Sequence, residues 1–323
     1  MNGRGSESAP APVLLSLDRV LVLAAAVALD RLGEPPTACH PVGWIGKLIA
    51  ALNRHAPSGG QQQLWYGIAI AVAPAALAGV ITYLLDALAQ RAPWPIRIIL
   101  RGATLSWTFS LTGLERAAQA VATDLEQNRI PAARSSVRSL VSRSTTDLSA
   151  GEIAAAAIES VAENASDSVI APLFWWSVLG PAAAGAYRAI NTADAMVGYH
   201  GRYELLGRAS ARLDDAVNFV PARLTGLAVC VASLQPRSLR TMLRDHVRTE
   251  SPNAGWPMSA MAGALKRRLA KPGHYVLGNP APPPVSGDIE RAISIVRRAI
   301  GLTLPLLCLE LRRNREASLE CGK

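Results

Sequence analysis

The segment from Leu64 to Leu85 contains no charged residue, and it constrains the fold of this chain more than any other feature. About 20 consecutive apolar residues are enough for an α-helix to cross the hydrocarbon layer of a membrane. Trp65 and Tyr66 stand near one end of the segment, and both side chains favour the membrane–water interface. Because backbone inside lipid must satisfy its own hydrogen bonds, the segment predicts a transmembrane helix.

Other apolar segments predict further membrane crossings. Together with the first, the candidate spans are 13–29, 64–85, 96–113, 169–190 and 217–234, with 299–309 as a shorter additional candidate. Segment 169–190 is interrupted by Pro172, Gly180 and Pro181. The interruption predicts a kinked or re-entrant element that lines a cavity, because irregular backbone at membrane depth needs protein or water around it.

Two polar blocks, 114–167 and 235–298, lie between the apolar segments. The first has apolar residues at helical spacing, and Ser149 with Glu152 forms a capping box that predicts a helix from Ala150. The second block is rich in Arg, Pro and Gly. We find neither the alternation typical of strands nor an internal repeat. The predicted class is therefore all-α, a polytopic integral membrane protein with cytoplasmic helical blocks between its spans.

Composition agrees with this class. Hydrophobic residues make up 50% of the chain and charged residues 18%, whereas about 25% charged is usual in soluble domains. The net charge is +9, but the cations form no long run with interleaved aromatic residues. This pattern argues against nucleic acid and suits lipid head groups or phosphate-bearing substrates. We expect residues 1–12 to be a disordered lead and 13–323 to form one membrane domain.

Three carboxylates form the first candidate site. Glu159, Glu163 and Asp167 follow one another at intervals of four residues, so a helix would place them on one face. No Lys or Arg lies in the same helix segment to pair with them, and Asn164 adds an amide. Oxygen ligands of this kind suit Mg²⁺ that is shared with substrate phosphates. The alternative is a solvated acidic helix face.

Two further clusters flank apolar segments. In YRAINTADAMVGY, Asn191 and Asp194 share a helix face behind Arg188, and the alternative is an ordinary capped helix end. In ARLDDAVNFVPAR, Asp214 and Asn218 are four residues apart and can share a face. The rest of that cluster is Arg212, Asp215 and Arg223. The alternative is a structural role, in which the Arg side chains snorkel to the membrane interface and form local ion pairs.

Two shorter motifs complete the candidates. Asn253 lies in SPNAGWP, a turn before an Ala/Met-rich helix whose first N–H groups could hold a phosphate, unless it is a plain turn. His40 begins HPVGWIGKLI; a lone histidine is more often a structural hydrogen-bonding residue than a ligand. The cysteines form no CxxC pair, and no nucleotide-binding fingerprint is present, so neither a zinc site nor a known ATP motif is indicated.

These strings, read in order, resemble the CobD/CbiB family of cobalamin biosynthesis. They are HPVGWIGKLI, ESVAEN followed by DSVIAPLF, YRAINTADAMVGY, ARLDDAVNFVPARL, and SPNAGWP with AMAGAL, and the resemblance runs from about Asp30 to Tyr275. It implies ATP- and Mg²⁺-dependent amidation of the propionate of adenosylcobyric acid with (R)-1-aminopropan-2-ol or its O-phosphate. The implied partners are these substrates, the lipid membrane and other cobalamin-assembly enzymes. This chain departs from the family pattern at two positions. Glu34 stands where the family often has Asp, and Met258 stands where many members have an acidic residue.

The implied roles divide the candidate residues into two groups. The expected catalytic residues are Glu159, Glu163, Asp167, Asp194 and Asp214, of which the first three are also the expected Mg²⁺ ligands. The expected substrate-binding residues are His40, Asn164, Arg188, Asn191, Arg212, Asp215, Asn218, Arg223 and Asn253.

The expected use of ATP and the cations of the second polar block predict on which side of the membrane the active site lies. Arg237, Arg240 and Arg244 belong to this block, and cytoplasmic loops are enriched in Arg and Lys. We therefore expect a multi-pass cell-membrane protein with a cytoplasmic active site. Two other functions stay open from the residues alone: a corrinoid transporter with a midplane site, and a non-catalytic scaffold for corrinoid enzymes.

Overall fold

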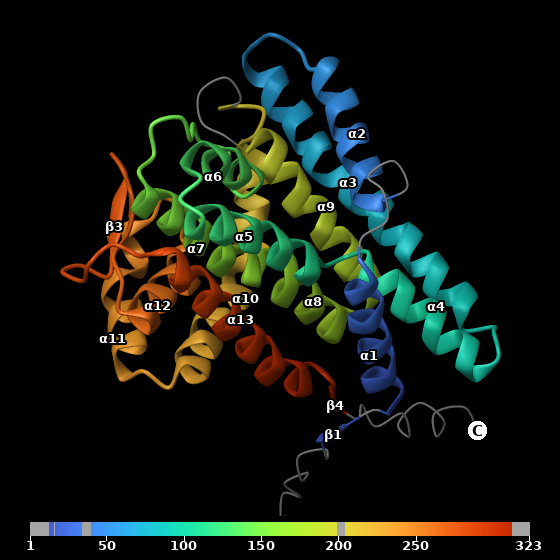
Figure 1. Cartoon of the computed structure of the whole chain (residues 1–323). Helices are drawn as coiled ribbons and strands as arrows, with labels where there is room; N and C mark the ends of the chain where they lie inside the picture. The colour runs from blue at the N-terminus through green and yellow to red at the C-terminus, as the bar shows by residue number, and fades with distance from the viewer. Residues whose placement is uncertain (1–12, 16, 34–39, 199–203, 312–323) are drawn as a thin grey trace, which may run out of the picture.

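Helices make up most of the computed structural model, which describes residues 13–15, 17–33, 40–198 and 204–311 (Figure 1). The first part of the chain forms β1 (Val13–Leu15), α1 (Leu17–Leu32), α2 (Pro41–Arg54), α3 (Gly60–Ala89), α4 (Trp94–Ser106), α5 (Leu111–Glu126), α6 (Ile130–Ser136) and the 3-10 turn η1 (Val137–Ser139). The middle forms α7 (Ala150–Ala165), the π-helical turn η2 (Ser166–Ile170), α8 (Ala171–Leu179), α9 (Pro181–Val197) and α10 (Arg208–Ser233).

The remaining elements are α11 (Pro236–Asp245), the 3-10 turn η3 (His246–Arg248), α12 (Gly255–Leu265), β2 (Leu269–Lys271), β3 (Tyr275–Leu277), α13 (Ser286–Leu307) and β4 (Leu309–Leu311). The strands form two short antiparallel pairs, β1 with β4 and β2 with β3. The all-α class is confirmed. The expected disordered lead, 1–12, lies outside the described residues.

Helix α7 is the centre of the main core. α5, α12, α13 and β2 pack around it, and its residues from Ile153 to Ala162 are buried without interruption (Figure 1). The predicted capping box is confirmed: Ser149 N donates to Glu152 Oε2 at 2.8 Å, and Glu152 N donates to Ser149 Oγ at 3.4 Å. Small residues make this burial possible, because alanine side chains let neighbouring helices approach closely on every side.

Two helices in the described part of the chain are long and apolar enough to cross a membrane, namely α3 and α10. Helix α3 contains all of 64–85, and α10 contains most of 217–234. The other expected spans are not single helices of that length. Segment 13–29 covers β1 and most of α1, and 299–309 covers the end of α13 and the start of β4.

Segment 96–113 is divided between two helices, because a distant carboxylate starts the second one. α4 ends at Ser106, and Asp30 of α1 accepts hydrogen bonds from Leu111 N at 3.2 Å and Thr112 N at 3.0 Å. These bonds satisfy N–H groups that the first turn of α5 leaves free. The predicted interruption of 169–190 is confirmed at Gly180 and Pro181: α8 ends at Leu179, its C-cap Gly180 has a φ of +85°, and α9 begins at Pro181. Pro172 does not interrupt the segment, because it lies in the first turn of α8.

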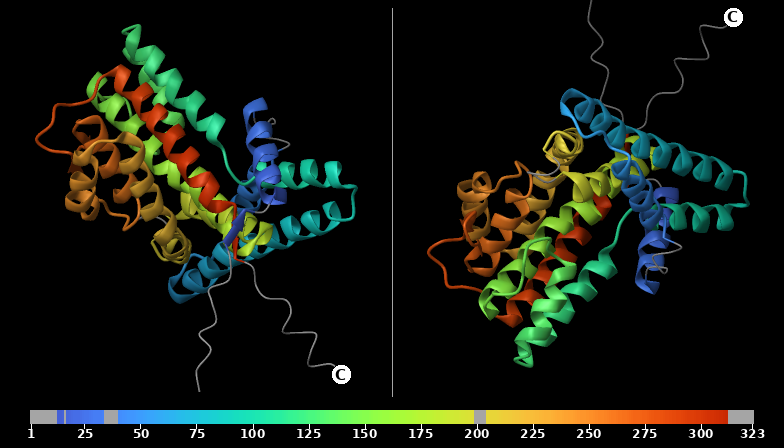
Figure 2. Two further views of the ribbon diagram at one scale, coloured as in Figure 1. Left: turned by 90° about the horizontal axis from the view of Figure 1, so that it is seen from below. Right: turned by 90° about the horizontal axis from the view of Figure 1, so that it is seen from above.

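Helix α3 lies along α9, and the turn between α3 and α4 reaches one extremity of the molecule (Figure 2). The two helices approach closely at Gly185, where an added Cβ would contact the Thr82 side chain and lie 2.9 Å from Ala78 O. Close crossings at small residues are typical of helices that pack in membranes.

We expect Gly185→Ala to lower the stability of the protein by roughly 1–3 kcal/mol, because the methyl group overpacks the α3–α9 contact. The measurement is the thermal unfolding midpoint in detergent. Gly287→Ala is the matched control, since a Cβ at Gly287 meets nothing within 4 Å. Equal midpoints for the two variants would contradict the close packing described here.

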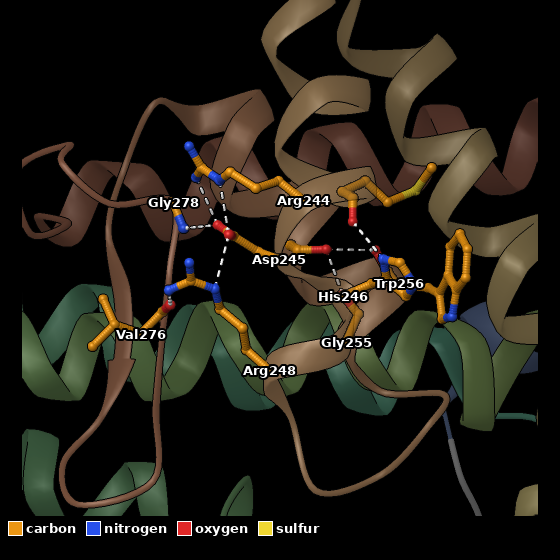
Figure 3. Close-up of polar contacts among 10 residues, drawn as sticks. Arg244, Asp245, His246, Arg248, Gly255, Trp256, Val276 and Gly278 are labelled. Atoms are coloured by element: carbon orange, nitrogen blue, oxygen red, sulfur yellow. Dashed lines mark hydrogen bonds and ion pairs between the residues drawn. The ribbon is translucent and has the colours of Figure 1, made fainter.

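The C-terminal part of the fold is joined by a fully buried carboxylate. Asp245 accepts two hydrogen bonds from Arg244, at 2.8 and 2.7 Å, and one from Gly278 N at 2.9 Å (Figure 3). Arg248 pairs with the same carboxylate at 3.1 Å. Burial alone raises the pKa of Asp245, but these hydrogen bonds and the two positive charges outweigh it and hold the pKa below its usual value. The β2–β3 hairpin is thereby attached to α11.

Candidate functional site

A polar cavity of about 1000 Å³ collects residues from separate parts of the chain. Its lining includes a group of the expected site residues, which are His40, Glu163, Asn164, Asp167, Arg188, Asn191 and Asp194. They come from the start of α2, from α7, from η2 and from α9. The structure therefore brings the first and second sequence clusters together around one space.

The acidic residues of α7 do not form a solvated face. Glu159 is only 5% exposed, because other elements cover most of the surface of α7. Its partner is Arg143, whose Nη2 lies 3.4 Å from Glu159 Oε2 and which precedes α7 in the chain. The alternative of a solvated acidic face is wrong. A carboxylate buried in the core of the fold is uncommon without a partner or a functional role.

The three predicted carboxylates face two different spaces. Asp167 lies in the π-helical turn η2, which continues α7. Glu163 and Asp167 line the main cavity, whereas Glu159 faces a smaller adjoining recess, also lined by Glu163. Among the described residues, no three acidic, imidazole or thiol side chains are close enough to form a metal site.

The carboxylates of the main cavity and of the recess have raised pKa values. Burial is the largest cause for each: it raises the pKa of Glu159 to about 7 and that of Asp194 to about 6. The pKa of Glu163 is raised, and that of Asp167 is raised well above its usual value by burial and by the neighbouring acids. Acids whose pKa lies near neutrality can exchange protons at physiological pH, as general bases do.

This clustering predicts a dependence of stability on pH. The Glu159 carboxyl titrates near 4.5 when unfolded and near 7 when folded, so between these values the unfolded chain loses its proton first. The free energy of unfolding should therefore fall as pH rises from 4.5 to about 7, by at most roughly 3.5 kcal/mol for this residue at about 1.4 kcal/mol per pKa unit. Glu159→Gln should reduce the fall measured by thermal unfolding across this range; an unchanged pH profile would contradict it.

Asp214 and Asn218 lie behind the cavity wall. Asn191 Nδ2, from the cavity lining, donates to Asp214 Oδ1 at 3.3 Å, and Asn218 Nδ2 donates to Asp214 Oδ2 at 2.9 Å. Tyr187 Oη donates to Asn218 Oδ1 at 2.8 Å and to Asp167 O at 3.1 Å. This network positions Asn191 and the π turn, so both residues support the site from α10.

The remaining expected site residues are not in the cavity lining. Asn253 is buried and joins two segments, because its Nδ2 donates to Asp215 O at 2.8 Å and its Oδ1 accepts from Arg223 Nη1 at 3.3 Å. The Arg223 guanidinium also lies over the rings of Phe219 and Trp256, 3.5 and 4.7 Å from their centroids. The first N–H groups of the SPNAG turn bond to Ser251 Oγ, so the turn is satisfied internally.

The fourth expected residue outside the lining is Arg212, which lies on α10. His40 is in the lining and also caps α2, since Val42 N donates to its Nδ1 at 3.2 Å. Its structural role is therefore confirmed, and it stands beside the carboxylates as well.

Of the cations that line the cavity and its recess, Arg188 was expected from the sequence, but three others were missed. Arg138 and Lys271 line the main cavity, and Arg143 and Lys271 line the recess. Arg138 and Arg143 lie in the Ser/Arg-rich stretch just before the capping box, which could have signalled them. Lys271 follows Glu163 by more than 100 residues, and only the packing of β2 against α7 brings it there. Met258 is buried on α12, where Tyr275 Oη donates to its Sδ at 3.8 Å.

An apolar groove of about 410 Å³ adjoins the polar cavity. It is formed mainly by α2 and α3, and Val42, Trp107 and Arg188 line both spaces. A ligand with an apolar body and charged arms could therefore contact the groove and the carboxylates together.

Comparison with known proteins gives consistent relatives. The chain matches the family model described as CobD/Cbib protein over residues 23–303. It is 41% identical over 290 residues to the cobalamin biosynthesis protein CobD of Dehalococcoides mccartyi (strain CBDB1), covering 88% of this chain and 94% of that protein. No solved structure matches this chain.

Two further relatives carry the same role in their names. The cobalamin biosynthesis protein CobD of Rhodobacter capsulatus is 42% identical over 277 residues, covering 82% of this chain and 87% of that protein. The cobalamin biosynthesis protein CbiB of Salmonella choleraesuis is 37% identical over 278 residues, covering 82% of this chain and 85% of that protein. This chain therefore belongs to the CobD/CbiB family and has a role in cobalamin biosynthesis.

Proposed function

We propose that this protein is an amide synthase that joins the propionate of adenosylcobyric acid to (R)-1-aminopropan-2-ol or its O-phosphate, using ATP. The observation that carries the proposal is the polar cavity in which Glu163, Asp167 and Asp194 stand with Arg138 and Lys271. Amide synthesis needs such a combination, because cations bind phosphates and carboxylates bind the amine and accept its proton.

The reaction balances in two steps. The substrate carboxylate attacks the γ-phosphorus of ATP, which releases ADP and leaves an acyl phosphate. The amine then attacks the acyl carbon, and inorganic phosphate leaves. Arg138, Arg188 and Lys271 would hold the phosphates, and a cavity carboxylate would take the proton that the ammonium group must lose. The raised pKa of Glu163 suits it to this transfer.

No three of the described carboxylates are close enough to hold a metal ion by themselves, so Mg²⁺ would bind here through one or two carboxylates together with substrate phosphates. Glu163, Asp167 and Asp194 offer carboxylate oxygens, and Asn164 and Asn191 offer amide oxygens, around one cavity. Hard oxygen ligands of few protein side chains, completed by phosphates and water, are typical of Mg²⁺ sites. When bound, the ion would neutralise charge on the transferred phosphoryl group. Glu159 is a poorer ligand than expected, since it is paired with Arg143 in the recess.

We further propose that the protein is a multi-pass protein of the cell membrane with a cytoplasmic site. Large apolar side chains are exposed along the two long helices, including Val72, Val80 and Leu88 on α3 and Phe219 and Val231 on α10. Exposed apolar surface of this extent favours lipid over water. Retention in the membrane fraction after an alkaline carbonate wash would support the proposal, and complete release would contradict it.

The test is an amidation assay with the full chain in detergent or nanodiscs. Adenosylcobyric acid, ATP, Mg²⁺ and one amine are mixed with the protein, and the corrinoid is followed by mass. A product that gains the mass of the amine less water, and that needs ATP, supports the synthase. Corrinoid binding without product would instead favour a carrier or a scaffold. Saturable corrinoid uptake into proteoliposomes without amine consumption would separate the carrier from the scaffold.

A further inference from the structure

Helix α11, at the outer edge of the molecule, buries a largely polar face (Figure 1). Its buried residues are Ser238, Thr241 and Asp245, together with Met242. Ser238 Oγ donates to Ala260 O of α12 at 2.7 Å, so this face is the one that packs on the rest of the fold. A surface helix of a water-soluble domain has the opposite arrangement, because its apolar residues face the core.

The outward face of α11 and the following turn η3 carries a column of apolar side chains. Leu239, Leu243 and Val247 follow one another at intervals of four residues, and they are 42%, 58% and 73% exposed. Large apolar side chains are unfavourable in water, and a row of them on one face is typical of a surface that meets another apolar phase. The inverted arrangement of α11 therefore indicates a contact with lipid or with another protein.

Arginines form the other half of this outward face. They are Arg237, Arg240, Arg244 and Arg248, and all four are exposed. The acid of segment 236–248 is Asp245, which is buried and pairs with Arg244 and Arg248, so it offsets only part of the positive charge (Figure 3). An apolar half beside a cationic half is typical of helices that lie at the surface of an anionic bilayer.

The position of α11 in the chain also favours lipid. α11 begins at Pro236, directly after α10, which is long and apolar enough to cross a membrane. The end of α10 and its cap are apolar on the outside, since Val231 is 60% and Leu234 80% exposed. A second copy of this chain, whose net charge is +9, would bring cations towards the arginines. Anionic phospholipids instead supply both hydrocarbon and phosphate.

We propose that α11 and η3 bind the surface of a bilayer that contains anionic phospholipids. The apolar column inserts among the acyl chains, and the arginines bind the lipid phosphates. The inference rests on the proposed membrane location and not on the proposed amide synthesis. Asp245 of the same helix accepts a hydrogen bond from Gly278 N and so holds the hairpin that carries Lys271, so the lipid contact also supports one wall of the main cavity.

The test is photo-crosslinking of the full chain in nanodiscs of equimolar phosphatidylcholine and phosphatidylglycerol. A benzophenone amino acid replaces Leu243, or Val247 in a second variant, and the adducts are identified by intact mass. We expect lipid adducts at both positions, with more phosphatidylglycerol than phosphatidylcholine. The same amino acid at Glu290, an exposed position of α13, is the matched control and should give no lipid adduct.

The arginines are tested by their effect on the choice of lipid. Arg237→Gln combined with Arg240→Gln, in the chain labelled at position 243, should lower the ratio of phosphatidylglycerol to phosphatidylcholine adducts roughly 2- to 10-fold, because two phosphate-binding cations are lost. An unchanged ratio, or equal adducts of the two lipids in the parent chain, would overturn the preference for anionic lipid.

Leu84, an exposed residue of α3, is the reference position for contact with lipid. Lipid adducts at Leu84 but none at Leu243 or Val247 would place α11 in water and overturn the proposal. Crosslinks between two copies of the chain from position 243 would overturn it in favour of a self-contact. Absence of lipid adducts at all three positions would count against the membrane location itself, and the amidation assay in detergent would then still decide the proposed synthesis separately.

Discussion

Glu163→Gln and Asp167→Asn are each expected to reduce amide formation by roughly 10²- to 10⁴-fold while the protein stays folded. Both carboxylates line the main cavity, and burial raises the pKa of each. The amide side chains keep the size of the carboxyl groups but cannot accept a proton or bind a cation with the same strength. The loss should appear mainly in kcat, measured with saturating ATP and amine.

The same variants should not lose stability. A raised pKa means that the folded protein disfavours the charged carboxylate, so a neutral side chain removes a cost. The thermal midpoint at a pH of about 8, where the free carboxyl groups are charged, should therefore equal or exceed that of the wild type. Glu290→Gln, on the exposed side of α13, is the control that should change neither quantity. Wild-type turnover in both well-folded variants would contradict a catalytic role for this acidic cavity.

Asp245→Asn is expected to destabilise the protein by roughly 2–4 kcal/mol. Asp245 is fully buried and accepts hydrogen bonds from Arg244 and from Gly278 N. An asparagine amide cannot accept from all of these donors, and one of its own N–H groups must face them. Because Arg244 and Arg248 are about half exposed and can turn towards water, the expected cost lies below that of a fully buried ion pair.

The measurement is the unfolding midpoint in detergent, and Asp147→Asn is the control because Asp147 is exposed. A second effect should follow from the position of the hairpin. Asp245 attaches the β2–β3 hairpin to α11, and this hairpin carries Lys271 and Tyr275 to the recess. Because Lys271 also lines the main cavity, we expect slower amide formation by the folded fraction. Equal midpoints for Asp245→Asn and Asp147→Asn would show that the network contributes little.

Local features of the fold were predictable from the sequence. The apolar segment 64–85 predicted α3, the capping box at Ser149 predicted the start of α7, and Gly180 with Pro181 predicted the break between α8 and α9. Each of these depends on interactions within a few residues, or on backbone angles that Gly and Pro prefer. The division of 96–113 was not predictable in this way, because Asp30 starts α5 from a distant helix.

The composition of the site depended on tertiary packing. Helical spacing grouped Glu159, Glu163 and Asp167, but Glu159 faces the recess and Asp167 the main cavity. Similarly, Arg223 and Asn253 were predicted to bind substrate, but they contact each other and do not line the cavity. Spacing along a helix indicates which side chains share a face, but it says nothing about the element that packs against that face.

By itself, the sequence determined the helical class, the long apolar helices and the residue types of the acidic cavity, because these follow from composition and short-range periodicity. Only the tertiary structure decided which acids share a space and which cations oppose them. Lys271 meets Glu163 through the packing of a hairpin on α7, and Arg143 meets Glu159 across a loop. Such contacts form between residues far apart in the chain, so their partners depend on how the whole core packs.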